Sequence, residues 1–108
     1  MYDKNMDKEQ RLTDFESLAA VCKALSHPAR LAILQTLARR GACICGEIVD
    51  LMPLSQATVS QHLKILKNAG LVTGEIDGPR SCYCINAETM RLLREEFGQM
   101  FVSLENCC

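Results

Sequence analysis

Two matched cysteine pairs flank one amphipathic segment, and this layout constrains the chain more than any other feature. The pairs are Cys43-Ile44-Cys45 and Cys82-Tyr83-Cys84, and the segment between them is a predicted helix from Ser55 to Asn68. Ser55 is suited to cap the start of this helix, and Gly70 is placed to stop it. The residues expected to face inward recur at helical spacing and are Val59, Leu63 and Leu66. The layout places two pairs of thiols beside an amphipathic helix.

The length and composition predict one globular domain. A chain of 108 residues fits a single domain, here residues 1–108, and 48% hydrophobic with 23% charged residues is a globular balance. No run approaches the ~18 apolar residues of a membrane span, and the first ten residues are too polar for a secretory signal. We therefore expect a cytoplasmic protein without a membrane segment, with residues 1–11 as a flexible tail and 105–108 as a C-terminal tail.

The cysteine count and the charge narrow the function. Seven cysteines in a reducing cytoplasm favour metal binding or redox chemistry over a disulfide framework, and an odd number cannot all pair within one chain. The net charge of -1 excludes a basic, nonspecific DNA coat. Any binding of nucleic acid must therefore use one restricted part of the protein surface.

Two further helices are predicted before the first cysteine pair. The first carries apolar residues at spacings of three and four, namely Leu12, Phe15, Leu18, Cys22 and Leu25. We interpret Cys22 as a small buried hydrophobe on that apolar face. Ser26 is able to cap a second helix that continues to Gly41, and Pro28 suits its first turn. The inward residues expected on the second helix are Leu31, Leu34, Leu37 and Ala38.

The remaining segments predict a mainly α fold with a small β-wing. Residues 42–45 are either a brief strand or the entrance to a short helix over 47–51, which Pro53 closes and which forms a helix-turn-helix candidate with the helix 55–68. Residues 71–76 and 81–86 read as strands joined by a turn at 77–80, a hairpin that would be the wing. The last helix carries a seam suited to another helix and points to a dimer; the seam is Met90, Leu93, Phe97, Met100 and Leu104.

The helix 55–68 has one face that is polar but not acidic. Glutamine can bridge adenine, alanine can touch a thymine methyl, and lysine can hold phosphate or guanine. The alternative is an ordinary solvated face, but the preceding helix-turn-helix and the hairpin favour DNA contact. The candidate DNA-contacting residues are Gln56, Ala57, Thr58, Ser60, Gln61, Lys64 and Arg80, with Lys67 on the same side of the helix. His62, at the edge of the apolar sector, is expected to be packed and hydrogen-bonded.

Three runs of residues carry a resemblance to a known family. They are Leu25-Ser26-His27-Pro28-Ala29-Arg30-Leu31-Ala32-Ile33-Leu34, the run from Leu54 to Leu66, and Ala69-Gly70-Leu71-Val72. In this order they resemble the ArsR/SmtB family of metal-sensing winged-helix repressors, and the similarity covers roughly residues 15 to 104. The resemblance implies a winged helix-turn-helix that forms a homodimer through its first and last helices. It also implies a double-stranded operator of two-fold symmetry that is released when an inducer binds.

The resemblance also implies a place for the inducer. In arsenic-responsive members a Cys-x-Cys pair lies at the start of the helix before the DNA-reading helix, and Cys43 and Cys45 match it. A third cysteine found in some members is replaced here by Ile48. The family's other common site uses histidine and acidic ligands on the final helix, where this chain has no histidine, so a zinc or nickel site there is not expected.

Trivalent arsenic or antimony needs more sulfur ligands than Cys43 and Cys45 supply. Residues at i and i+2 of a strand share a face, so Cys82 and Cys84 project together from the second wing strand. We hypothesise that the two pairs converge in a three- or four-thiolate site for As(III) or Sb(III), with Zn(II) or Cd(II) as other inducers and no obligatory cofactor. The competing source of ligands is the tail pair Cys107-Cys108.

Three other functions use the same residues. The thiols could form a disulfide or polysulfide link, which would make the protein an oxidant or reactive-sulfur sensor. A small thiol enzyme or metal-transfer protein is disfavoured because the chain has neither a Cys-x-x-Cys on a βαβ unit nor a cofactor loop. A dimerisation module with structural zinc would carry metal and ignore DNA. We therefore expect a regulator and no enzyme.

Overall fold

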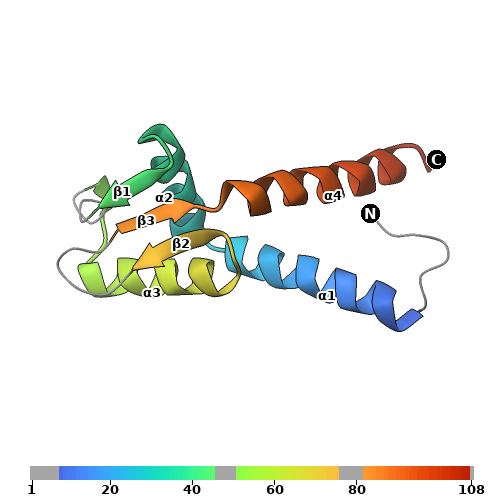
Figure 1. The fold of residues 1–108 in the computed structure, drawn as a ribbon, viewed down its shortest axis with the longest axis horizontal. Coiled ribbons are helices and arrows are strands. Elements are labelled where there is room, and N and C mark those ends of the chain that lie inside the picture. Colours follow the sequence, from blue (N-terminus) through green and yellow to red (C-terminus); the bar gives the residue numbers. More distant parts are fainter. Residues whose placement is uncertain (1–7, 46–50, 76–81, 108) are drawn as a thin grey trace.

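The structure, a computed structural model, describes residues 8–45, 51–75 and 82–107. The helices in these ranges are α1 (Lys8–Leu25), α2 (Pro28–Arg39), α3 (Gln56–Asn68) and α4 (Ala87–Glu105). The strands are β1 (Cys43–Cys45), β2 (Val72–Glu75) and β3 (Cys82–Ile85). Figure 1 shows the sheet lying against α3, with α1 and α4 extending away from it on the same side. The predicted class, mainly α with a small β-wing, is confirmed.

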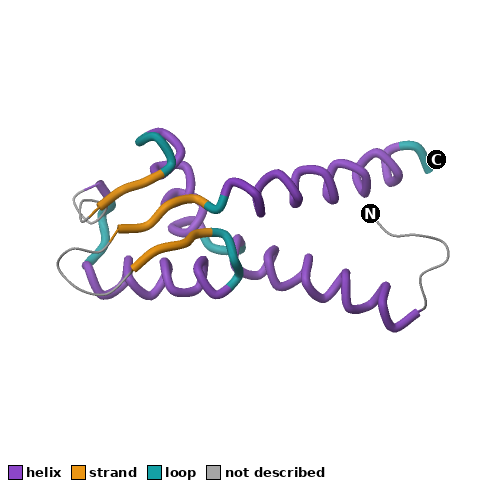
Figure 2. The backbone as a smooth tube through the Cα atoms, in the orientation of Figure 1, coloured by secondary structure: helices purple, strands orange, loops and turns teal. Residues whose placement is uncertain are grey.

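The three strands form one antiparallel sheet in the order β1-β3-β2, as the tube in Figure 2 shows. Of the two alternatives for residues 42–45, the strand is right. Gly41 and Ala42 both have positive φ, 83° and 78°, and this reversal leads the chain from α2 into β1. A Cβ at Gly74 would collide with the backbone carbonyl oxygen of Cys82, so glycine permits the close approach of β2 and β3.

The core lies between the sheet, α2 and α3. The side chains with almost no exposure are Ile33, Leu37, Val59, Leu63, Leu66, Leu71 and Val72. Three of them are the residues predicted to face inward from α3. Ile44 and Tyr83, the central residues of the two cysteine triplets, are also buried, so each cysteine pair flanks a core side chain.

Local caps fix where the helices begin. Ser55 caps α3 and Asn86 caps α4, each accepting a hydrogen bond from the third residue of its helix, Thr58 N and Thr89 N. The prediction of Ser26 as the cap of α2 is wrong. His27 is the cap, since its Nδ1 accepts from Ala29 N at 3.0 Å, while the Ser26 hydroxyl donates back to the Lys23 carbonyl. Pro28 occupies the first turn, as expected.

Three predicted core positions are wrong. Cys22 is exposed, because α1 buries Leu18, Val21 and Ala24, a stripe that Cys22 does not share. Leu31 is 52% exposed, since α2 turns Ile33 and Leu37 inward and two residues correspond to ~200° around a helix. Ala38 is likewise exposed. Both helices carry apolar residues on more than one face, and the periodicity alone did not decide which face is buried.

The molecule is elongated, with extents of 49 × 26 × 21 Å, because α1 and α4 project beyond the sheet. No residue of α4 is buried within the chain. Among the described residues, no helix combines the length and the apolar character that crossing a membrane requires.

Some predictions fall partly or wholly outside the described residues. The short helix expected over 47–51 and the turn at 77–80 lie in or beside such gaps, as does most of the tail 1–11. α1 already begins at Lys8, inside the stretch predicted as that tail.

Candidate DNA-reading helix and sulfur site

The helix α3 presents its predicted DNA face away from the core. Gln56, Ala57, Gln61 and Lys64 are exposed, and Ser60 is half-buried. Thr58 is also half-buried and takes part in the cap, because its hydroxyl lies 3.0 Å from Ser55 Oγ and its N–H donates to the same atom. Arg80, the predicted wing contact, lies outside the described residues.

Lys67 has a partner within the chain. Its Nζ donates to the Gly74 carbonyl at 2.6 Å, which ties the last turn of α3 to β2. Lys67 therefore supports the position of the wing strand rather than extending the polar face of α3.

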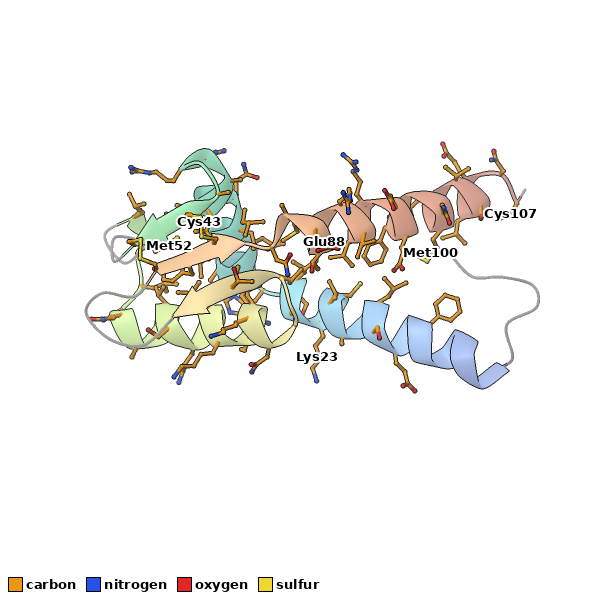
Figure 3. All side chains as sticks on the ribbon, in the orientation of Figure 1. Lys23, Cys43, Met52, Glu88, Met100 and Cys107 are labelled. Atoms are coloured by element: carbon orange, nitrogen blue, oxygen red, sulfur yellow. A yellow bond between two sulfur atoms is a disulfide. The ribbon has the colours of Figure 1, made fainter. Side chains whose placement is uncertain are left out.

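The two cysteine pairs meet across β1 and β3, as hypothesised. The antiparallel register places Cys43 opposite Cys84 and Cys45 opposite Cys82. Each cysteine forms a disulfide with the residue opposite it. The bonds are Cys43–Cys84 and Cys45–Cys82, with Cα atoms 4.1 and 4.0 Å apart. The cysteines alternate with Ile44 and Tyr83, which point into the core, so all four sulfurs lie on the opposite face of the sheet. Figure 3 shows Cys43 at this seam.

The sequence favoured metal binding or redox chemistry over a disulfide framework, whereas these four cysteines are joined in two disulfides. The physical reason is the register, which places each cysteine directly opposite another, within reach of a bond. In this oxidised form the described residues contain no group of three or more His, Cys, Asp or Glu side chains arranged to hold a metal ion. Reduction of both bonds would give four thiols on one sheet face, a soft donor set that suits thiophilic ions.

Cys107, the described cysteine of the C-terminal tail, lies apart from these four cysteines (Figure 3). Cys107 is exposed just beyond the end of α4, where its Sγ donates to the Leu104 carbonyl. Figure 3 labels it at the opposite end of the molecule from Cys43. Cys108 lies outside the described residues. Within one chain, Cys107 is therefore not positioned to complete the site (Figure 3).

A polar junction that no sequence pattern predicted lies behind α3. His62 is 9% exposed, and its Nδ1 lies 3.3 Å from Nη1 of Arg30. Its ring centroid is 4.5 Å from that of His27. Burial, then the neighbouring His27 and Arg30, lower the pKa of His62. The expectation of a packed, hydrogen-bonded His62 is confirmed, whereas its partners, 32 residues away, left no local pattern.

Known proteins resemble most of this chain. A family model described as a helix-turn-helix domain matches residues 25–75. An uncharacterized HTH-type transcriptional regulator of Methanocaldococcus jannaschii is 42% identical over 66% of this chain and 80% of its own length. The arsenical resistance operon repressor of Bacillus subtilis is 40% identical over 73% of this chain and 76% of its own.

A solved structure supports the fold. An ArsR-like transcriptional regulator from Rhodococcus sp. RHA1 superposes with a TM-score of 0.70 at 23% identity, over 86% of this chain and 87% of the other. At this identity the likeness concerns the fold alone, and the family follows from the more similar sequences. The chain belongs to the ArsR/SmtB family of DNA-binding, winged-helix transcriptional repressors, and it is a regulator and not an enzyme.

Proposed function

We propose that this chain represses transcription as a cytoplasmic homodimer on a two-fold symmetric operator, and that As(III) or Sb(III) bound at cysteine thiolates releases the DNA. The observation that carries the proposal is the register of β1 against β3, which brings Cys43, Cys45, Cys82 and Cys84 together. The arsenical resistance repressor among the relatives supports the choice of inducer.

The DNA contacts are assigned to the outer face of α3 and to the wing. Gln61 would read a base edge and Lys64 a phosphate, with Gln56, Ala57, Ser60 and Arg80 completing the contact. Loss of Lys64 is expected to weaken binding to all sequences, since phosphates carry no sequence information. Loss of Gln61 is expected to relax specificity; operator discrimination at the wild-type level in Gln61→Ala would remove it from the set.

The homodimer is proposed to form through α1 and α4. Where burial is described on these helices, the large apolar side chains that remain exposed are Phe15, Leu92, Phe101, Val102 and Leu104. When a second copy of the chain covers apolar surface of this kind, its removal from water stabilises the dimer. Each dimer would then present two copies of α3 to successive turns of the operator.

The inducer would bind the reduced form. Opening the two disulfides takes four electrons and four protons, which a cytosolic thiol reductant supplies. Each arsenic–sulfur bond then forms as a thiol proton leaves with a hydroxyl of arsenous acid as water. Three of the four sulfurs would satisfy pyramidal arsenic, and all four would suit Zn(II) or Cd(II) in a tetrahedron.

Fluorescence anisotropy tests the proposal. Reduced protein is bound to a labelled operator, selected from random duplexes, and titrated with arsenite, antimonite, zinc and cadmium. Arsenite is expected to release the wild type and Cys107→Ser but not Cys82→Ser/Cys84→Ser. Unchanged release from that double variant would remove the wing cysteines from the site, and an operator complex that ignores all four ions would refute metal sensing.

The observed disulfides favour a second candidate, a redox-sensing repressor. Oxidant or reactive sulfur would close Cys43–Cys84 and Cys45–Cys82 and change how the sheet holds α3. Operator affinity measured for the fully oxidised and fully reduced chain, with thiol content determined by mass spectrometry, separates the two candidates. Equal affinity in the two forms would rule out redox sensing.

A further inference from the structure

Arg30 joins three helices at one point. From α2, its Nε donates to the Ala24 carbonyl at 2.6 Å, and its Nη2 donates to the Lys23 carbonyl at 3.4 Å. These are carbonyl groups of the last turn of α1, where a positive charge is favourable. Its Nη1 meets Nδ1 of His62 on α3 at 3.3 Å. One guanidinium therefore links the first helix to the helix that carries the DNA face.

This contact fixes the protonation of His62. A guanidinium has donors only, so Nδ1 of His62 must be the acceptor and its proton must sit on Nε2. Among the described residues, the titratable or charged groups that face His62 are His27 and Arg30, from the cap and the first turn of α2. α1 contributes carbonyl groups, which bind Arg30. A second proton, on Nδ1, would therefore place the imidazolium cation beside the guanidinium and remove the hydrogen-bond acceptor.

We propose that His62 is a positioning residue for operator recognition, and that its neutral imidazole, held by Arg30, sets the orientation of α3 against α1. The outer face of α3 reads the operator only if its angle to the rest of the chain is fixed. The His62 side chain lies on the opposite, buried face, so it acts on DNA through α3 and touches none. The lowered pKa of His62 agrees with this role, because it keeps the ring neutral near pH 7.

The inference goes beyond sensing at the cysteines and stands without it. Operator discrimination, meaning the affinity for operator divided by that for random duplex, should be greatest above pH 6.5, the ordinary histidine pKa. It should fall as His62 gains a proton at lower pH. The affinity for random DNA depends mainly on phosphate contacts and should change much less with pH.

Three variants test the role of His62. His62→Asn keeps an acceptor near the position of Nδ1 but does not titrate, so its discrimination should not change between pH 7.5 and 5.5. His62→Leu loses the acceptor, and its operator discrimination should be at least about tenfold lower than that of the wild type at every pH. This is the effect of losing a hydrogen bond to a charged group. His27→Asn is the matched control, because asparagine can cap α2 and the neighbouring histidine is removed. Because His27 helps to lower the pKa of His62, this variant should keep a pH-dependent discrimination, with its midpoint moved to higher pH.

Anisotropy with operator and random duplexes gives these ratios, and circular dichroism at each pH establishes that the variants are folded. A wild-type pH profile in His62→Asn, or a pH-independent ratio in His27→Asn, would overturn the proposal. Nitrogen-15 NMR of the imidazole provides a test without DNA. At pH 7.5 we expect the proton of His62 on Nε2; a proton on Nδ1 would contradict the contact with Arg30.

Discussion

The helices α3 and α4 begin in the same way and end in different surroundings. Each has a side-chain cap that binds the N–H of its third residue, and each alternates apolar and polar residues at helical spacing. α3 buries Val59, His62, Leu63 and Leu66, whereas α4 has no fully buried residue within the chain. The difference shows that α3 is packed into the core of one chain, whereas α4 is only partly covered by it.

The largest expected effect comes from removing a core residue of α3. Leu66 is fully buried, and Leu66→Ala should lower the free energy of unfolding by about 2–5 kcal/mol. Leu104→Ala on α4 is the control, since Leu104 is 59% exposed and should have little effect on the stability of a single chain. Urea titration at low protein concentration measures both. Similar losses would erase the contrast between the helices.

A charge on the exposed face of α4 should act on assembly instead of folding. Phe101→Glu replaces a 59% exposed ring and should weaken a dimer by about 2–3 kcal/mol, the value of burying such a side chain. Arg91→Glu, at another exposed position of the same helix, should leave the dimer intact. Sedimentation equilibrium gives the dissociation constants. A wild-type monomer at every concentration would mean that this face has another partner.

The caps of α3 and α4 should contribute about equally to the free energy of unfolding, although the two helices differ in burial. Ser55→Ala and Asn86→Ala each remove one hydrogen bond to a backbone N–H and should each cost about 1 kcal/mol. Chemical denaturation of both variants at one protein concentration tests this. If only the α3 variant loses stability, α4 contributes nothing to the cooperative unit.

The smallest effect is a pH dependence that belongs to α3 alone, since α4 has no histidine. The pKa of His62 is lower in the folded chain than the ordinary 6.5, so below that pH the unfolded chain binds more protons. The contribution of His62 to stability is therefore complete above pH 6.5 and is lost as the pH falls through the folded pKa. His62→Asn should remove this part of the wild-type profile. An identical slope in the variant would assign the dependence to other groups.

Local patterns predicted much of this architecture. The caps at Ser55, the stop at Gly70 and the inward face of α3 follow from short-range chemistry, and the i, i+2 spacing placed the paired cysteines on one face of each strand. The contact of Arg30 with His62 could not be predicted, because it depends on how three helices cross. Cys22 was misplaced because α1 has two apolar stripes. The oxidation state of the paired cysteines depends on the surroundings of the chain and is not encoded in their spacing.

The alternation of cysteines with Ile44 and Tyr83 also affects the fidelity of folding. A slip of β1 by one residue along β3 would turn the cysteines of one strand away from those of the other. A slip by two residues would leave only one cysteine facing another. In this antiparallel pairing, both cross-strand bonds can therefore form in one register only. A chain that contains both disulfides has its strands covalently fixed in the correct register.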